Sequence, residues 1–340
     1  MEVSQLPLPP SMVEMLHLAG FSVVADLDGI SALELADELK MSPSDASQLL
    51  ASVRSHGLRT PRAPPATSAL ELLHDERHSE KIVTAVKELD DLLGGGIPLR
   101  QLTELVGVPG VGKTQLSIQL ALTVQIPRLF HGAEGEAVYI DTEGSFMAER
   151  AHAMAEALLR HLHATAHRAA DHAQAAAAAS LRASHLLERI HCFRVHDAAE
   201  LLATVRSLNF FLAERKTVKL VVVDSVAFHF RHGVSDYTRR HQMLGQLTQA
   251  LSEYATRHSL SVVMVNQVTT KVNDATNTSS IQPALGESWA HACNIQLVLH
   301  WMNGTRVARL CKGREPGWAE YQVTEEGVRS VQNPTRGADT

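Results

Sequence analysis

A glycine-rich stretch of the sequence carries the residue types best suited to chemistry. It reads Gly107-Val108-Pro109-Gly110-Val111-Gly112-Lys113-Thr114 and matches the pattern G-x-x-x-x-G-K-[ST], whose loop wraps phosphate groups. The glycines keep side chains away from the phosphates, and Lys113 brings a positive charge to the β- and γ-phosphates. The Thr114 hydroxyl is placed to ligate Mg²⁺. The stretch therefore predicts a binding site for a nucleoside triphosphate.

The flanks of this loop support the match. Residues 102–106 are typical of a short buried strand, and residues 115–122 of a helix with an apolar stripe. In a strand–loop–helix unit, free backbone N–H groups and the helix dipole meet an anion at the start of the helix. We therefore favour a phosphate-binding loop over a plain glycine-rich turn.

Three further strands are predicted to bring polar side chains to the carboxyl edge of the sheet, where open α/β sheets bind ligands. Residues 136–141 lead to Glu143. This residue is either the base that orients an attacking water or an acidic residue in the first turn of the next helix, and we favour the base. Residues 219–223 lead to Asp224, placed to hold a water of the Mg²⁺ shell. Residues 261–268 include Gln267, which is able to sense the γ-phosphate.

Two polar segments near these strand ends are candidates for contact with single-stranded DNA. One is a predicted long loop, 269–286, and the other is a shorter predicted loop, 230–238, with Arg231 inside it and Arg239 and Arg240 after it. In a channel for single-stranded DNA, backbone charge matters more than base identity. Because Lys271 is the only basic residue of the longer segment, the predicted contact is weak in charge.

Composition limits the classes of protein that remain. A chain of 340 residues with 45% hydrophobic residues has room for one α/β domain and a smaller one. The net charge of −6 gives no general attraction to nucleic acid. Cys192, Cys293 and Cys311 lie far apart, which argues for a reducing, intracellular setting. No apolar run approaches membrane-spanning length, so no membrane partner is expected.

Residues 1–58 are predicted to form a small all-α N-terminal domain. Helices are expected at 12–18, 31–39 and 42–53, the second with a capping box of Ser31 and Glu34. Up to Thr60 this part has three basic and eight acidic residues, the reverse of what phosphate binding needs. We therefore favour a protein-docking or structural role over direct DNA binding.

The rest of the chain is predicted as a proline-rich linker (59–80), an α/β core (81–330) and a tail (331–340). The core contains an Ala- and His-rich helical insertion at about 160–188. His163 and His167 have a spacing able to bind a metal. Because no carboxylate partner is evident for either ring, we favour a solvated insertion without a metal.

Together these motifs resemble the RecA-type recombinase family, in particular its eukaryotic branch. The resemblance covers about residues 81–323 and rests on the stretches 89–97, 107–115, 139–146 and 265–268. Residues 284–289 and 125–127 are most similar to one paralogue of that branch, a recombination mediator. The resemblance implies a RecA-like P-loop NTPase core, with a twisted, mainly parallel sheet flanked by helices, and a small all-α N-terminal domain.

The resemblance also implies roles for particular residues. Lys113, Thr114 and Asp224 would bind ATP·Mg²⁺, with Thr114 and Asp224 toward the metal. Glu143 would activate water, and Gln267 would report the γ-phosphate. The implied ATP-binding residues are Gly107, Val108, Pro109, Gly110, Val111, Gly112, Lys113, Thr114, Gln115 and Arg150, the last stacked on adenine.

The implied activity is that of a DNA-dependent ATPase in homologous recombination and double-strand break repair. It would assemble or stabilise recombinase filaments on single-stranded DNA, in hetero-oligomers with other recombinase paralogues. The implied location is the nucleus, with the cytoplasm and mitochondrion as further sites. Two alternatives are an ATP-switched scaffold with negligible turnover and, less favoured because the loops carry little charge, an autonomous motor such as a hexameric helicase.

Two positions depart from the family pattern. Residues 66–69 lack the aromatic anchor of the family's Phe-x-x-Ala linker, which puts long homopolymers in doubt. Lys312 stands where the recombinase has an acidic residue that caps the neighbour's ATP. We hypothesise that Lys312 supplies positive charge to an adjacent γ-phosphate.

Overall fold

The computed structural model describes residues 3–5, 8–27, 30–56, 67–232, 237–273, 278–285 and 287–331. The chain divides into two compact units, Met1–Glu76 and Arg77–Thr340. The finer boundaries expected from the sequence, at 58, 80 and 330, stay predictions.

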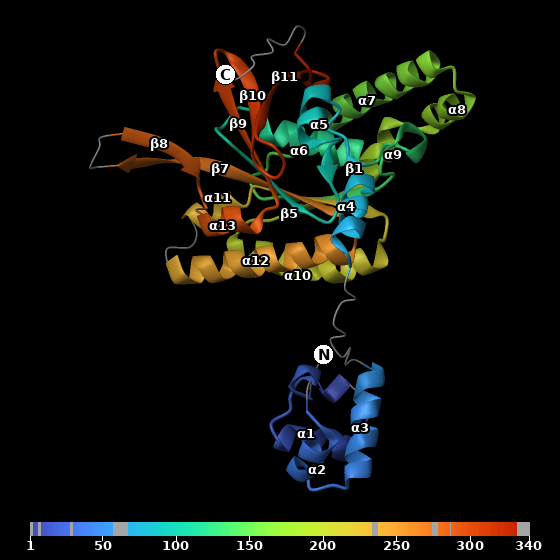
Figure 1. Cartoon of the computed structure of the whole chain (residues 1–340), viewed down its shortest axis with the longest axis vertical. Coiled ribbons are helices and arrows are strands. Elements are labelled where there is room, and N and C mark those ends of the chain that lie inside the picture. The colour runs from blue at the N-terminus through green and yellow to red at the C-terminus, as the bar shows by residue number, and fades with distance from the viewer. Residues whose placement is uncertain are drawn as a thin grey trace. The chain divides into compact units, whose positions relative to one another are not determined.

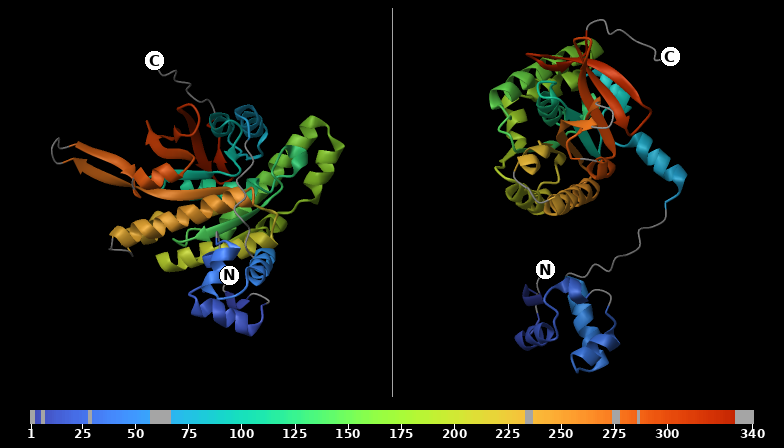
Figure 2. Two further views of the ribbon diagram at one scale, coloured as in Figure 1. Left: turned by 60° about the horizontal axis from the view of Figure 1, so that its bottom comes forward. Right: turned by 90° about the vertical axis from the view of Figure 1, so that its left-hand side faces the viewer.

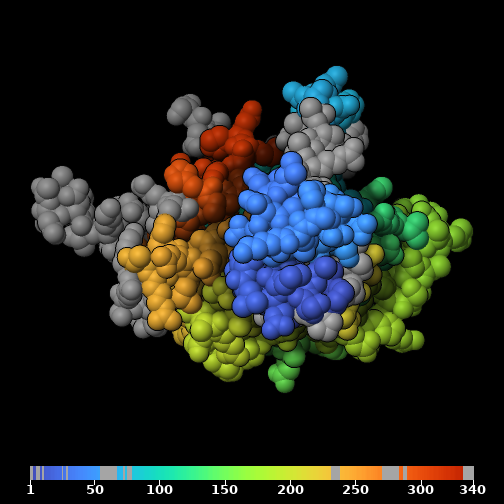
Figure 3. Space-filling model, turned by 90° about the horizontal axis from the view of Figure 1, so that it is seen from below, coloured from blue at the N-terminus to red at the C-terminus, as the bar shows by residue number. Residues whose placement is uncertain are grey.

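The N-terminal unit is helical and has its own small core (blue in Figure 3). Its elements are η1 (Val3–Gln5), α1 (Pro10–Leu18), η2 (Val24–Leu27), α2 (Ala32–Glu38) and α3 (Pro43–His56). The Ser31–Glu34 capping box is present at the start of α2, as predicted. Leu16, Leu35 and Leu50 are buried in the core, so these short helices stabilise one another mainly by burying apolar side chains.

The predicted linker contains a helix, α4 (Ala69–His78). Ser68 Oγ accepts from the Glu71 backbone N–H at 3.2 Å, and Glu71 Oε2 accepts from the Ser68 backbone N–H at 2.8 Å. This reciprocal pair is a capping box, and it begins a helix directly after the proline-rich stretch. Residues 57–66, with most of that stretch and Ala66, lie outside the described residues.

The second unit is built on a sheet of ten described strands and a separate pair, β1 (Lys81–Ile82) and β2 (Ile97–Pro98). The order in the large sheet is β12-β11-β10-β9-β3-β7-β6-β4-β5, with β8 paired to β7. The strands from β9 through β5 in this order are mutually parallel, whereas each of β9, β10, β11 and β12 is antiparallel to the next. The large-sheet strands are β3 (Leu102–Gly107), β4 (Glu136–Asp141), β5 (Ile190–Arg194), β6 (Val218–Asp224), β7 (Ser261–Asn273), β8 (Thr278–Pro283), β9 (Ile295–Met302), β10 (Thr305–Lys312), β11 (Gly317–Thr324) and β12 (Gly327–Arg329).

Helices cover both faces of this sheet (Figures 1 and 2). Along β6, Val222 points into one hydrophobic core while Val221 and Val223 point into the other, which is why the strand is apolar throughout. One face carries α5 (Lys87–Leu93), α6 (Lys113–Thr123), α7 (Ala148–Ala169), α8 (His172–Ser180) and α9 (Ala183–Glu188); the other carries α10 (Ala198–Glu214), α11 (Ala227–His232), α12 (Tyr237–Arg257) and α13 (Glu287–Ala292). The predicted fold class is confirmed.

Two predicted loops prove to be partly regular structure. The segment 269–286 was expected to be a loop, but β7 continues to Asn273 and pairs antiparallel with β8. The β-branched residues Thr269, Thr270 and Val272 favour this extension. The other predicted loop, 230–238, begins inside α11 and ends inside α12. Residues 233–236, 274–277 and 286 lie outside the described part.

The Ala- and His-rich insertion is helical, as predicted. The 22 residues of α7 are followed by α8, which contains the alanine run, and by α9. His163 Nδ1 bonds to the Leu159 carbonyl at 2.8 Å, so that ring atom is engaged by the backbone of its own helix. Among the described residues, no helix has the length and apolar character needed to cross a bilayer.

Candidate nucleotide-binding site

A cavity of about 330 Å³ lies at the carboxyl ends of the central parallel strands. β3 ends at Gly107, which is level with Gln267 in the β3–β7 pairing. Asp141 of β4 pairs with Asp224 of β6 in the same layer. Topology alone therefore brings the motif residues together. The cavity is lined by Pro109, Gly110, Gly112, Lys113, Thr114, Gln115, Glu143, Asp224, Val265, Gln267, Arg306 and Val323.

The loop after β3 needs glycine at its ends. Gly112 has φ of +109°, and a Cβ there would lie 2.9 Å from Val323 Cγ2. At Gly107 a Cβ would meet the Leu299 carbonyl oxygen at 2.5 Å. The loop is thus packed against β9 and β11 of the antiparallel half. Tyr321 Oη adds a hydrogen bond to the Val111 carbonyl at 2.9 Å.

Lys113, the first residue of α6, is held against the loop. Its Nζ donates to the carbonyls of Gly107 and Val108 at 2.7 and 3.0 Å. Burial lowers the pKa of Lys113 from its usual value, and the carboxylates of Asp224 and Glu143 oppose that change. The ammonium group is therefore a partly desolvated charge at the start of a helix, where phosphate binds best.

Asp224 is buried at the end of β6. Its Oδ2 accepts from Tyr139 Oη at 2.8 Å. Burial raises the pKa of Asp224; hydrogen bonds from Thr114 and Tyr139 work against this rise, and the charges of Glu143 and Asp141 add to it. Mg²⁺ is usually bound by one or two protein oxygens together with phosphate and water. The Thr114 hydroxyl and the Asp224 carboxylate fit that donor set, and their role toward Mg²⁺ stays a prediction.

Glu143 is positioned by the carboxylate of Asp141, whose role the sequence analysis did not identify. Asp141 Oδ1 accepts the backbone N–H groups of Glu143, Gly144 and Ser145 at 3.2, 2.8 and 3.1 Å. Arg194 Nη1 donates to the other oxygen, Oδ2, at 2.7 Å. One buried, ion-paired carboxylate therefore fixes the turn from which Glu143 enters the cavity.

The Glu143 carboxylate contacts two neighbouring strand ends. Gln267 Nε2 donates to Oε1 at 2.9 Å, and the Ser225 hydroxyl donates to the same oxygen. The predicted base and the predicted γ-phosphate sensor are thus in direct contact. These two hydrogen bonds to one oxygen fix the orientation of the Glu143 carboxylate at the cavity.

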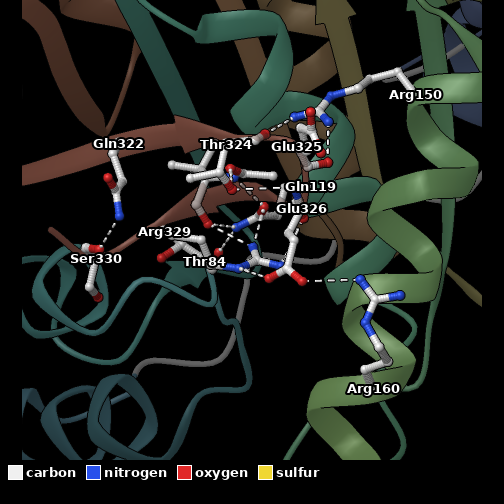
Figure 4. A network of polar contacts seen from close by, with 12 residues as sticks. Thr84, Gln119, Arg150, Arg160, Gln322, Thr324, Glu325, Glu326, Arg329 and Ser330 are labelled. Atoms are coloured by element: carbon white, nitrogen blue, oxygen red, sulfur yellow. Dashed lines mark hydrogen bonds and ion pairs between the residues drawn. The ribbon is translucent and has the colours of Figure 1, made fainter. Parts of the chain in front are cut away.

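Arg150 of α7 lies beside this cavity and does not line it. Its Nε donates to Gln115 Oε1 at 2.6 Å, and Nη2 donates to the Thr324 carbonyl at 2.5 Å. Nη1 donates to the Glu325 carbonyl (Figure 4). Each of the three nitrogens is engaged, so the plane of the guanidinium is fixed. A planar cation fixed in this way is suited to stacking on a nucleobase.

The turn that holds Arg150 is itself tied to α6 and α7. Gln119 Oε1 accepts from the Val328 backbone N–H at 2.8 Å and from Arg329 Nη1 at 3.1 Å. Arg160 of α7 pairs with Glu326 at 3.1 Å (Figure 4). This network closes one wall of a second cavity of about 620 Å³. The β11–β12 turn therefore has one defined position relative to Arg150.

Two residues that line this cavity, Arg306 of β10 and Val323 of β11, were not predicted from the sequence as part of any motif. Neither lies in a motif, and their approach to the loop depends on the pairing of the antiparallel strands. Lys312 lies elsewhere: its Nζ donates to the carbonyls of Ala290 and His291, each at 3.0 Å. In this chain Lys312 therefore caps the carboxyl end of α13, and its predicted contact with a neighbour's γ-phosphate stays a hypothesis.

The residues predicted to contact single-stranded DNA are placed only in part. Arg239 and Arg240 lie in the first turns of α12. The side chains of Arg231 and Lys271 lie outside the described part of the structure. DNA contact therefore stays a prediction.

A parallel sheet with a phosphate-type loop after β3 and acidic residues at the ends of neighbouring strands is the architecture of the RecA-type P-loop fold. The sequence model of the Rad51 family matches residues 77–163 and 161–331. The chain belongs to the Rad51 family.

Individual relatives agree with this assignment. The chain is 41% identical over 341 residues to the DNA repair protein RAD51 homolog 3 of Cricetulus griseus, covering 97% of this chain and 92% of the relative. For the protein of the same name from Dictyostelium discoideum, identity is 37% over 267 residues, covering 78% and 69%. The DNA repair and recombination protein RadA of Metallosphaera sedula is 31% identical over 271 residues, covering 78% and 77%.

Proposed function

We propose that this chain is an ATP-binding and ATP-hydrolysing recombinase paralogue that works in hetero-oligomeric complexes. Its task is to assemble or stabilise recombinase filaments on single-stranded DNA during homologous recombination and double-strand break repair. Membership of the Rad51 family and relatives named for DNA repair support this process. The runs 284–289 and 125–127 support the finer assignment as the C paralogue of the eukaryotic recombinase.

The observation that carries the enzymatic part is the contact between Glu143 and Gln267 on a cavity shared with Lys113 and Asp224. The loop N–H groups and Lys113 bind the β- and γ-phosphates. Thr114 and Asp224 hold Mg²⁺, which when bound offsets charge on the phosphate oxygens. Glu143 orients the attacking water and accepts its proton. Gln267 contacts Glu143 in the structure, and the γ-phosphate of bound ATP would come between the two side chains.

The partners we propose follow from the family. They are other recombinase paralogues, the recombinase filament and single-stranded DNA. Arg239 and Arg240 and the segment 269–286 are the proposed DNA contacts. We also propose a nuclear location, with the cytoplasm and the mitochondrion as further sites by resemblance.

The test is ATP turnover by the purified protein, alone and with single-stranded DNA, compared with Glu143→Gln. Loss of a general base costs about 10²–10⁴-fold in rate, so turnover should fall at least about 100-fold while ATP affinity changes by less than about threefold. Glu149→Gln is the control, because Glu149 is an exposed carboxylate in the first turn of α7. It should leave both quantities unchanged.

The outcomes separate the two candidate activities. ATP binding with turnover that Glu143→Gln abolishes supports the hydrolytic proposal. ATP binding without turnover, alone and with DNA, contradicts it and supports the ATP-switched scaffold, whose site would be completed by another subunit.

A further inference from the structure

Arg306 places a second cation at the phosphate cavity, from the antiparallel part of the sheet and outside every sequence motif. It lies in β10 and lines the cavity together with Lys113, Glu143 and Gln267. Lys113 comes from the start of α6, whereas Arg306 comes from the antiparallel half of the sheet. An anion in the cavity would therefore lie between two positive side chains.

The guanidinium of Arg306 is held without being neutralised. Its Cζ lies 4.3 Å from the centre of the Trp301 ring, and Trp301 is its partner in the β9–β10 register. Such a cation–π contact orients a guanidinium and leaves its N–H groups available. Its Nε is buried and has no hydrogen-bond partner among the described residues. No described carboxylate forms an ion pair with it.

A buried donor without a partner costs free energy unless a ligand supplies the acceptor. Phosphate oxygens are well matched to a guanidinium, because its fork of N–H groups fits two oxygens at once. Lys113, by contrast, already donates to two loop carbonyls. Lys113 thus has its third N–H left for a phosphate, and Arg306 Nε adds a donor that has no acceptor among the described residues.

The position of Arg306 indicates which phosphate it meets. Arg306 shares the cavity with Glu143 and Gln267, the two residues placed at the site of water attack. Arg150, at the base end, does not line this cavity. We infer that Arg306 donates hydrogen bonds to the γ-phosphate of ATP and makes the site discriminate ATP from ADP. This inference rests on the proposed ATP-binding function.

The experiment compares dissociation constants for ATP and ADP, each with Mg²⁺, in the wild type and Arg306→Ala. Hydrogen bonds to charged groups contribute about 1.5–3 kcal/mol, so ATP affinity should fall by about 10- to 100-fold. ADP affinity should change by less than about twofold, since ADP lacks the contact. Arg309→Ala is the matched control: Arg309 is exposed on the same strand and does not line the cavity.

The results separate this inference from the proposed function. Unchanged ATP affinity in Arg306→Ala, or equal losses for ATP and ADP, would overturn the γ-phosphate contact while leaving ATP binding by the wild type intact. Failure of the wild type to bind ATP would contradict the proposed function itself. Circular dichroism checks folding, and Arg306→Gln, which keeps the length of the side chain, takes the same test if Arg306→Ala does not fold.

Discussion

The two halves of the large sheet contribute to the nucleotide site in different ways. The parallel half places Glu143, Asp224 and Gln267 on one edge because its strands end together. The antiparallel half, β9–β12, contributes side chains and carbonyls that lie against the loop from outside, among them Arg306 and Val323. The residues of the parallel half lie in local sequence motifs. Those of the antiparallel half reach the site only because distant strands pair in register.

We expect the parallel half to bind the phosphates and the antiparallel half to help recognise the rest of the nucleotide. The parallel half contains the charged residues that we propose for binding phosphate and Mg²⁺. The antiparallel half supplies the carbonyls of Thr324 and Glu325 that fix Arg150, and its Tyr321 hydroxyl holds the loop at Val111. We therefore expect changes in the parallel half to abolish binding and changes in the antiparallel half to alter selectivity.

The largest effect is expected from Lys113→Ala in the parallel half. The variant removes a charge that meets two phosphates, and each charged hydrogen bond is worth about 1.5–3 kcal/mol. ATP affinity should fall by at least about 100-fold, as measured by equilibrium binding of a fluorescent ATP analogue. Lys216→Ala, at an exposed lysine, is the control. If the ATP affinity of Lys113→Ala stays within about threefold of the wild type, the proposal that the parallel half binds the phosphates is wrong.

A smaller loss is expected where the two halves touch, at Gly112. Alanine at a φ of +109° costs about 1–2 kcal/mol, and its Cβ would lie 2.9 Å from Val323 Cγ2. Gly112→Ala should weaken ATP binding by about 10- to 30-fold. Gly110→Ala has a similar φ of +78° but no atom within 4 Å of its Cβ, so it should show only the backbone part of the loss.

The double variant Gly112→Ala/Val323→Ala isolates the contact between the halves. It removes the atom that the new Cβ would meet, so its ATP affinity should match that of Gly110→Ala. If the double variant binds no better than Gly112→Ala, the contact with β11 does not contribute and only the backbone conformation matters.

These cases show what the sequence can and cannot predict. Lys113 and Thr114 lie within one continuous motif, and Asp224 follows a clearly apolar buried strand. The fold class and the proximity of these three residues could therefore be predicted from the sequence. Asp141 was not assigned because its work is done by hydrogen bonds to four successive backbone N–H groups. The sequence alone does not show that an Asp at the end of a strand accepts these hydrogen bonds, because they depend on the conformation of the following turn.

Other features depend on pairing that no local pattern encodes. Arg306 lies in a sequence that reads as an ordinary strand, and only its register with Trp301 turns it toward the cavity. The extension of β7 was missed because Asn273 and the polar residues after it favour a loop, whereas antiparallel pairing with β8 satisfies the backbone. Polar composition therefore did not predict the regular structure.

A moderate effect is expected from Arg150→Ala, which tests the base end of the site. Loss of a cation–π contact costs about 0.5–2 kcal/mol, so ATP affinity should fall by about 3- to 30-fold. Inorganic triphosphate has no base, and its affinity should stay unchanged in a competition assay. The control is Arg160→Ala in the same helix, which removes the ion pair to Glu326 and leaves Arg150 in place. An equal loss of affinity for ATP and for inorganic triphosphate would mean that Arg150 contacts the phosphates and not the base.

The smallest effect is expected from pH, through Asp224. Because burial raises the pKa of this carboxyl above its usual value, protons compete with Mg²⁺ at a pH where exposed carboxylates are still ionised. Full Mg²⁺-dependent ATP affinity is thus expected above the raised pKa, with a several-fold loss as the pH falls through it. Phosphate groups titrate near pH 6 as well, so Asp224→Asn is measured in parallel. Only the wild type should show the additional Mg²⁺-dependent loss, and identical pH profiles for the two proteins would mean that the metal does not depend on the ionised carboxylate of the parallel half.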